Sequence, residues 1–195
     1  MEQKTHRYRW LFITCTLLVF AGIVFLKFTP NKTISTRWLT DSQPGSYQVH
    51  DFRDGDTVTV DMGGTIETVR FIGVDTPETH KENTPVQCYG SEASAYTRQR
   101  IGQGKIRLKA DRLTTNRDRY DRLLRYVMVD GSTDLGYELV SKGYAFAYAF
   151  PFANSQKYAR AMKDAQVAKR GLWGVCAATQ DPVTGQWHSP PISGQ

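Results

Sequence analysis

Residues 54–83 read DGDTVTVDMGGTIETVRFIGVDTPETHKEN, and this stretch decides the fold that the sequence predicts. Alternating apolar and β-branched residues indicate two strands, near 56–62 and 65–74. Gly63-Gly64 lies between them, and glycine accepts the positive φ that both central positions of a tight hairpin turn require. The stretch therefore predicts a β-hairpin with acidic residues where its strands end.

The segments around this hairpin indicate a small barrel covered by helices. Further strand patterns lie near 46–52, 105–110 and 123–129. Helix patterns fit 91–101, 135–142 and 154–170. Gly171 would supply the C-terminal cap of the last helix. Five short strands with interspersed helices predict an α+β fold, a five-stranded β-barrel with three helices.

The folded domain is expected at 46–176, with segments of different composition on both sides. Residues 28–45 are polar, contain prolines and read as a linker. Residues 177–195 hold three prolines and lack periodicity, which is typical of a disordered tail.

An apolar segment at 10–27 predicts an N-terminal transmembrane helix, with residues 1–9 in the cytoplasm. Its apolar run is close to the lower limit of about 17 residues for a membrane span. A cleaved signal peptide, cut after Ala21, is the alternative. In both cases we expect the domain outside the cytoplasm, periplasmic or extracellular, and secreted if the segment is cleaved.

The positive charge of the chain is modest in total but concentrated in one segment. The net charge is +6, but part of it belongs to the N-terminal segment. Between Arg98 and Tyr126, lysine and arginine are frequent and only three acids interrupt them. Such a concentration is typical of a polyanion site, although charge alone also fits a solvated basic surface.

Cys88 and Cys176 are the two cysteines of the expected domain, and Cys15 lies in the apolar segment. A compartment outside the cytoplasm is oxidising, which favours a disulfide between Cys88 and Cys176. The spacings match no zinc pattern. Two buried free thiols are the alternative.

Four acids lie around the strand ends of the opening stretch: Asp54, Asp56, Asp75 and Glu78. Arg70 stands on the strand that leads to Asp75. Hard oxygen ligands without a His or Cys cluster indicate Ca²⁺ or Mg²⁺, and Ca²⁺ is favoured because it tolerates irregular ligand sets. A bound dication lets an acidic site also hold a phosphate. The combination indicates cleavage of a phosphodiester.

The sequence resembles the staphylococcal (micrococcal) nuclease family over about residues 46–173. The motifs that carry the resemblance appear in the family's order: DGDT at 54–57, RFIGVDTPET at 70–79, YGSEASA at 89–95, DRYDRLL at 118–124, Leu139-Val140 with Gly143, and Gly171-Leu172-Trp173. The resemblance implies an OB-fold barrel with three helices and a Ca²⁺-dependent endonuclease that cuts DNA and RNA to 3′-phosphate products.

The resemblance also implies a role for each matching position. By position, Asp56 and Asp75 are the calcium carboxylates, Thr76 adds a backbone carbonyl, Arg70 and Arg122 hold the scissile phosphate, and Glu78 is the candidate general base. Tyr120 and Tyr148 are candidates to stack on bases, and Phe150 is a weaker one. Because stacking tolerates any base, we expect a preference for single strands.

Two features depart from the family pattern. Asp121 stands where the family often has glycine, which adds a negative charge beside Arg122. The aromatic residues of 144–150 align with the family's tyrosines only after a gap, and alternating aromatics also fit a core strand. Two alternatives of other classes remain: a non-catalytic OB-fold nucleic-acid binder, and a surface module whose basic stripe binds other polyanions. No obligate protein partner is expected.

Overall fold

The computed structural model describes residues 45–79 and 85–192 of the 195-residue chain. The proposed anchor or signal segment at 10–27 and nearly all of the linker lie outside the described residues, so both stay predictions. Within the described ranges, none of the helices has the length and apolar character that crossing a membrane requires.

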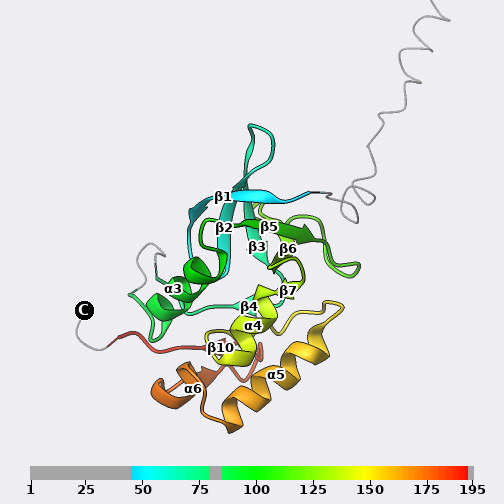
Figure 1. Ribbon diagram of the computed structural model, residues 1–195. Helices are drawn as coiled ribbons and strands as arrows, with labels where there is room; N and C mark the ends of the chain where they lie inside the picture. Colours follow the sequence, from blue (N-terminus) through cyan, green and yellow to red (C-terminus); the bar gives the residue numbers. More distant parts are fainter. Residues whose placement is uncertain (1–44, 80–84, 193–195) are drawn as a thin grey trace, which may run out of the picture. The chain divides into compact units, whose positions relative to one another are not determined.

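A closed five-stranded barrel forms the centre of the domain (Figure 1). Its strands are β1 Tyr47–Phe52, β2 Thr57–Asp61, β3 Ile66–Phe71, β5 Lys105–Lys109 and β6 Leu123–Val129. Neighbours in the order β3-β2-β1-β5-β6 are antiparallel. Parallel pairing of β3 with β6, with Val69 opposite Leu123, closes the barrel. The five strands expected from the sequence are confirmed.

The β2–β3 hairpin has the turn that the sequence predicts. Gly63 and Gly64 both have positive φ, at 69° and 93°. Asp61 caps the turn, because its carboxylate accepts a hydrogen bond from Gly64 N at 2.7 Å. The resulting register sets Thr57 opposite Arg70, which brings the start of β2 to the end of β3.

Strand β5 separates apolar from basic side chains. Ile106 and Leu108 are buried in the barrel, whereas Lys105, Arg107 and Lys109 are exposed. Successive side chains of a strand point to opposite faces, so this alternation gives the barrel an apolar interior and a basic outer surface.

Three helices and one short helical turn cover the barrel: α3 Gly90–Ile101, α4 Leu135–Lys142, α5 Ser155–Val167 and α6 Leu172–Val175. Helices α4 and α5 lie side by side (Figure 1). Helix α5 ends at Val167, earlier than the expected 170, and the left-handed residue after it is Lys169, with φ 50°.

Gly171 is therefore not the C-terminal cap of α5. It permits a close approach instead, because a Cβ there would come within 2.2 Å of Gly143 O.

Short strands complete the domain. β4 Val74–Asp75 pairs with β8 Phe146–Ala147, and β7 Thr133–Asp134 extends the sheet beside β6. β9 Thr179–Gln180 and β10 Trp187–His188 form a hairpin after α6.

The C-terminal segment corrects the prediction of a disordered tail over residues 177–192. Besides the β9–β10 hairpin, it hydrogen-bonds the segment before α3, with Ile192 N donating to Val86 O at 2.9 Å. The composition of this segment is that of a flexible chain, but a disulfide at its start and long-range bonds along its length hold it in place.

Cys88 and Cys176 form a disulfide across 88 residues of sequence. This confirms the expected pairing and excludes the alternative of two free thiols. The bond joins the start of α3 to the end of α6, where the C-terminal segment begins.

Candidate active site

Arg70 lies between two carboxylates at the open end of the hairpin. Its Nη1 is 3.0 Å from Asp56 Oδ2 and its Nη2 is 2.8 Å from Asp75 Oδ1. Nη1 also donates to Val74 O at 2.6 Å. The hairpin register and the tight turn after β3 thus bring together three of the residues that the sequence singled out.

Asp56 is 4% exposed and fully engaged by its neighbours. Its Oδ2 accepts hydrogen bonds from Thr76 N at 2.8 Å and Thr76 Oγ1 at 3.0 Å. Its Oδ1 accepts from Thr57 Oγ1 at 2.9 Å. A Cβ at Gly55 would come within 2.8 Å of Thr76 Cγ2, which explains glycine between the two aspartates.

The acids of the site raise one another's proton affinity. Burial raises the pKa of Asp54 to about 7, and the charges of Asp56 and Glu78 act in the same direction. Burial also raises the pKa of Asp75 to about 6, although Arg70 opposes this shift. Burial would lower the pKa of Arg70, but Asp56 and Asp75 outweigh it and the pKa is raised. The single guanidinium therefore leaves an excess of negative charge.

Glu78 is half-buried beside this cluster. Its backbone is held by Gln87, whose Oε1 accepts from Glu78 N and whose N donates to Glu78 O, both at 2.9 Å. Within residues 45–79 and 85–192, no hydrogen bond or ion pair engages the Glu78 carboxylate. The carboxylate is thus open to accept a proton from a bound molecule.

Arg122 lies in the loop before β6 and pairs with Asp118 of the same loop. Asp118 Oδ2 is 2.7 Å from Arg122 Nε and 2.6 Å from Nη2. Burial would raise the pKa of Asp118, but hydrogen bonds from the Arg122 side chain and from the backbone N–H groups of Arg122 and Tyr120 outweigh it and lower the pKa. Among the described residues, no hydrogen bond or ion pair joins Arg122 to Arg70, Asp56 or Asp75. Asp118 thus orients the second guanidinium independently of the first.

The two predicted stacking tyrosines are exposed. Tyr120 is 64% exposed, and the guanidinium of Arg122 lies 5.3 Å from its ring centroid. Tyr148 is 43% exposed, and its backbone N donates a hydrogen bond to Gly73 O. It lies close enough to Arg70 to contribute to raising the pKa of that guanidinium. Phe150 is exposed as well, whereas Phe146 is buried. Within 144–150, the core explanation therefore fits Phe146 and not Tyr148.

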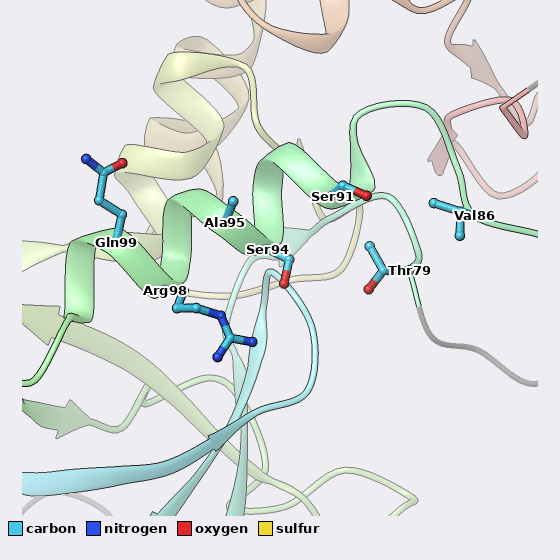
Figure 2. Close-up of a pocket in the computed structure, with 7 residues that line it drawn as sticks. All are labelled: Thr79, Val86, Ser91, Ser94, Ala95, Arg98 and Gln99. Atoms are coloured by element: carbon cyan, nitrogen blue, oxygen red, sulfur yellow. The ribbon is translucent and has the colours of Figure 1, made fainter.

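A separate hollow lies along α3 (Figure 2). This hollow measures about 560 Å³ and is lined by Thr79, Val86, Ser91, Ser94, Ala95, Arg98 and Gln99. Thr79 connects it to the acids, because its Oγ1 donates to Asp54 Oδ1 at 3.2 Å. Arg70, Asp75 and Arg122 do not line it.

Comparison with known proteins identifies the family. Residues 68–175 match the family model described as staphylococcal nuclease homologue. The chain belongs to the staphylococcal nuclease family. Thermonuclease of Staphylococcus hyicus is 36% identical over 165 residues, covering 82% of this chain and 96% of that protein. Thermonuclease of Staphylococcus intermedius is 41% identical over 138 residues, covering 69% and 79%. Endonuclease YncB of Bacillus subtilis (strain 168) is 42% identical over 105 residues, covering 54% and 48%.

These matches confirm the expected family of hydrolytic nucleases and agree with the barrel. Asp121, at a position where glycine is expected to be common, adopts the left-handed conformation, with φ 63°. Its carboxylate lies 3.5 Å from Arg117 Nε and is 87% exposed. The turn before Arg122 thus accommodates an aspartate, and Arg117 offsets part of its charge.

Gln186 is the site residue that sequence reasoning missed in this family member. Its Nε2 donates to Asp75 Oδ2 at 2.8 Å across 111 positions of sequence. No local sequence motif predicts a hydrogen bond between residues so far apart in the sequence. Trp187 was the available signal, because a large aromatic residue in a polar tail gains stability only by burial against the domain.

Proposed function

We propose that this nuclease is a Ca²⁺-dependent endonuclease that hydrolyses phosphodiester bonds of DNA and RNA to 3′-phosphate products outside the cytoplasm. The proposal rests on the position of Arg70, whose guanidinium forms ion pairs with both Asp56 and Asp75. A guanidinium and two hard carboxylates at one point are the groups needed to hold a phosphate beside a cation.

Asp56, Asp75 and the Thr76 carbonyl are the groups proposed to hold Ca²⁺. Among the described residues, no three His, Cys, Asp or Glu side chains converge into a complete metal site. Ca²⁺ takes about six to eight oxygen ligands and accepts carbonyls and waters, so two carboxylates suit it better than a metal that needs a closed side-chain cage. When bound, it would neutralise the excess acid charge and stabilise negative charge on the phosphoryl oxygens.

Arg70 and Arg122 are proposed to bind the phosphate. Their forked donors match phosphate oxygens and would stabilise the charge that develops during attack. Asp118 engages Nε and Nη2 of Arg122, and we assign Nη1 to the substrate. The parallel β3–β6 pairing supports this assignment, because it sets the start of β6 beside the strand that carries Arg70.

Glu78 is proposed as the general base for the attacking water. Its carboxylate stands near the acid cluster, as its effect on the pKa of Asp54 indicates. Its backbone is fixed by Gln87 at two points. Proton acceptance by a positioned carboxylate contributes about 10²–10⁴-fold to a rate.

The exposed rings of Tyr120 and Tyr148 and the basic face of β5 support binding of single-stranded nucleic acid. Stacking contributes about 1–3 kcal/mol per base and requires unpaired bases. Affinity is expected to fall steeply with salt, because phosphate contacts release counterions.

A location outside the cytoplasm is supported by the Cys88–Cys176 disulfide, since structural disulfides persist in oxidising compartments. We propose membrane anchoring through the segment at 10–27, or secretion if that segment is cleaved. Protease treatment of cells whose outer membrane, where present, has been permeabilised tests the anchored form: the domain should be degraded while the cytoplasmic membrane stays intact. Full protection of a cell-bound domain under these conditions would contradict the proposal.

The test of the activity is cleavage of denatured DNA with Ca²⁺ or with a chelator. Glu78→Ala and Arg122→Ala should each lower turnover by orders of magnitude. The matched controls are Glu92→Ala and Arg160→Ala, exposed residues of α3 and α5 outside the site. Cleavage that is retained in chelator would contradict the proposed Ca²⁺ dependence. Ca²⁺-independent binding of DNA without cleavage would favour the non-catalytic binder, and equal binding of any polyanion would favour the surface module.

A further inference from the structure

The C-terminal hairpin reaches the site from the far end of the chain. Gln186 Nε2 donates to Asp75 Oδ2 at 2.8 Å, while Arg70 Nη2 donates to the other oxygen, Oδ1, at the same distance. Asp75 is thus held from two sides by donors of different kinds, one charged and one neutral.

The orientation of the Gln186 amide follows from its partners. A carboxylate only accepts hydrogen bonds, so the NH₂ group has to face Asp75. The Oε1 atom lies 3.4 Å from Ala149 N, a backbone donor next to Tyr148. In the reversed orientation, the Gln186 amide oxygen would face Asp75 Oδ2, and the NH₂ group would face the N–H of Ala149. Each partner therefore requires the same orientation.

The hairpin is fixed next to Asp75 by an aromatic cluster. The ring of Trp187 lies 5.0 Å from Trp173 and 6.4 Å from Phe146, centroid to centroid. Phe146 is the residue directly opposite Asp75 in the β4–β8 pair. Packing of the half-buried Trp187 against these rings sets the adjacent Gln186 at the carboxylate.

A second set of bonds ties the same segment to the residues that hold Glu78. Cys88 N donates to Pro190 O at 2.8 Å, and Ser189 Oγ donates to Cys88 O at 2.7 Å. Gln87, next to Cys88, holds the Glu78 backbone. The C-terminal segment therefore contacts the site at two points, directly at Asp75 and through Cys88 beside Gln87.

We propose that Gln186 is a positioning residue of this nuclease, which fixes the Asp75 carboxylate in the orientation that binds the cation. The inference rests on the proposed function, in which Asp75 is a calcium ligand. A carboxylate offers about four lone-pair positions, so Asp75 can accept from Arg70 and Gln186 and still bind a metal. Loss of such an outer partner typically costs about 10–100-fold in metal affinity or activity.

The experiment is calorimetric titration of Ca²⁺ into the full chain and into Gln186→Met, which keeps the length of the side chain and removes its donor. Gln180→Met is the matched control, because Gln180 lies in the same hairpin but donates to Gly185 O. We expect about 10–100-fold weaker Ca²⁺ affinity for Gln186→Met and unchanged affinity for the control. Cleavage of denatured DNA at limiting Ca²⁺ should fall by the same factor and recover in excess Ca²⁺.

Bound Ca²⁺ also stabilises the folded chain, so positioning is separated from a folding defect by unchanged urea unfolding of the Ca²⁺-free variant. Gln186→Ala, with urea unfolding of all variants, provides a second measurement. Affinity of Gln186→Met equal to that of the control would overturn the inference, and so would tighter binding, which would make Gln186 an obstruction. Failure of the unsubstituted chain to bind Ca²⁺ would overturn the proposed function itself, and the inference with it.

Discussion

Removal of the Cys88–Cys176 disulfide should cost more stability than any single contact in the domain. The bond joins residues 88 positions apart. In the loop-entropy model, a crosslink over this length destabilises the unfolded chain by about 4–5 kcal/mol at 25 °C. A native domain is stable by only about 5–15 kcal/mol, so this loss is a large share of the whole.

Equilibrium unfolding in urea of Cys88→Ser, Cys176→Ser and the double variant measures this loss. Each single variant should lose as much as the double variant, because either change breaks the same bond. In a domain of this size the midpoint of thermal unfolding should fall by roughly 10–20 °C. Reduction of the unsubstituted protein should reproduce the effect.

A loss below about 1 kcal/mol would refute this reasoning, because the crosslink would then not constrain the unfolded chain. Additive losses in the two single variants would refute it differently. They would assign the effect to packing of each sulfur atom and not to the bond.

Three further substitutions test a buried hydrogen bond, the charge of Asp121 and the role of Arg70. Tyr126→Phe removes the hydroxyl that donates to buried Asp111, and should lower the free energy of unfolding in urea by about 1–3 kcal/mol; an unchanged value would show that the bond is dispensable. Asp121→Asn keeps a residue that tolerates the left-handed conformation and removes its charge, so KM for DNA should fall in steady-state assays; a constant KM would mean that Arg117 already neutralises the charge. Arg70→Lys replaces the planar guanidinium, which can donate two parallel hydrogen bonds, by a single ammonium group. Single-turnover cleavage should slow by at least about 10²-fold, and near-normal cleavage would show that Arg70 does not bind the phosphate.

The barrel was predictable because its signals are local. Alternation along β5 and the glycine pair between β2 and β3 report strand faces and turns within a few residues. The central site was predictable for the same reason: the segment from Asp56 to Thr76 folds back on itself as one hairpin and one turn.

The C-terminal segment was not predictable because its stability comes from distant partners. Its composition resembles that of a disordered chain, and the bonds that order it reach Asp75, Val86 and Cys88, about a hundred residues away. The early end of α5 has a local origin instead: Lys169 adopts the left-handed conformation, and Arg170 N donates to Ala165 O at 2.9 Å after the last turn. Pattern analysis expects glycine in that role and therefore extends the helix to the next glycine.

The most direct test of the central claim is the chemistry of the cut. A labelled single-stranded oligonucleotide is incubated with the protein in Ca²⁺ or in chelator, and the ends of the products are analysed. We predict internal cleavage with 3′-phosphate ends in Ca²⁺ and none in chelator. Cleavage that persists in chelator, or products that carry 5′-phosphate ends, would contradict it.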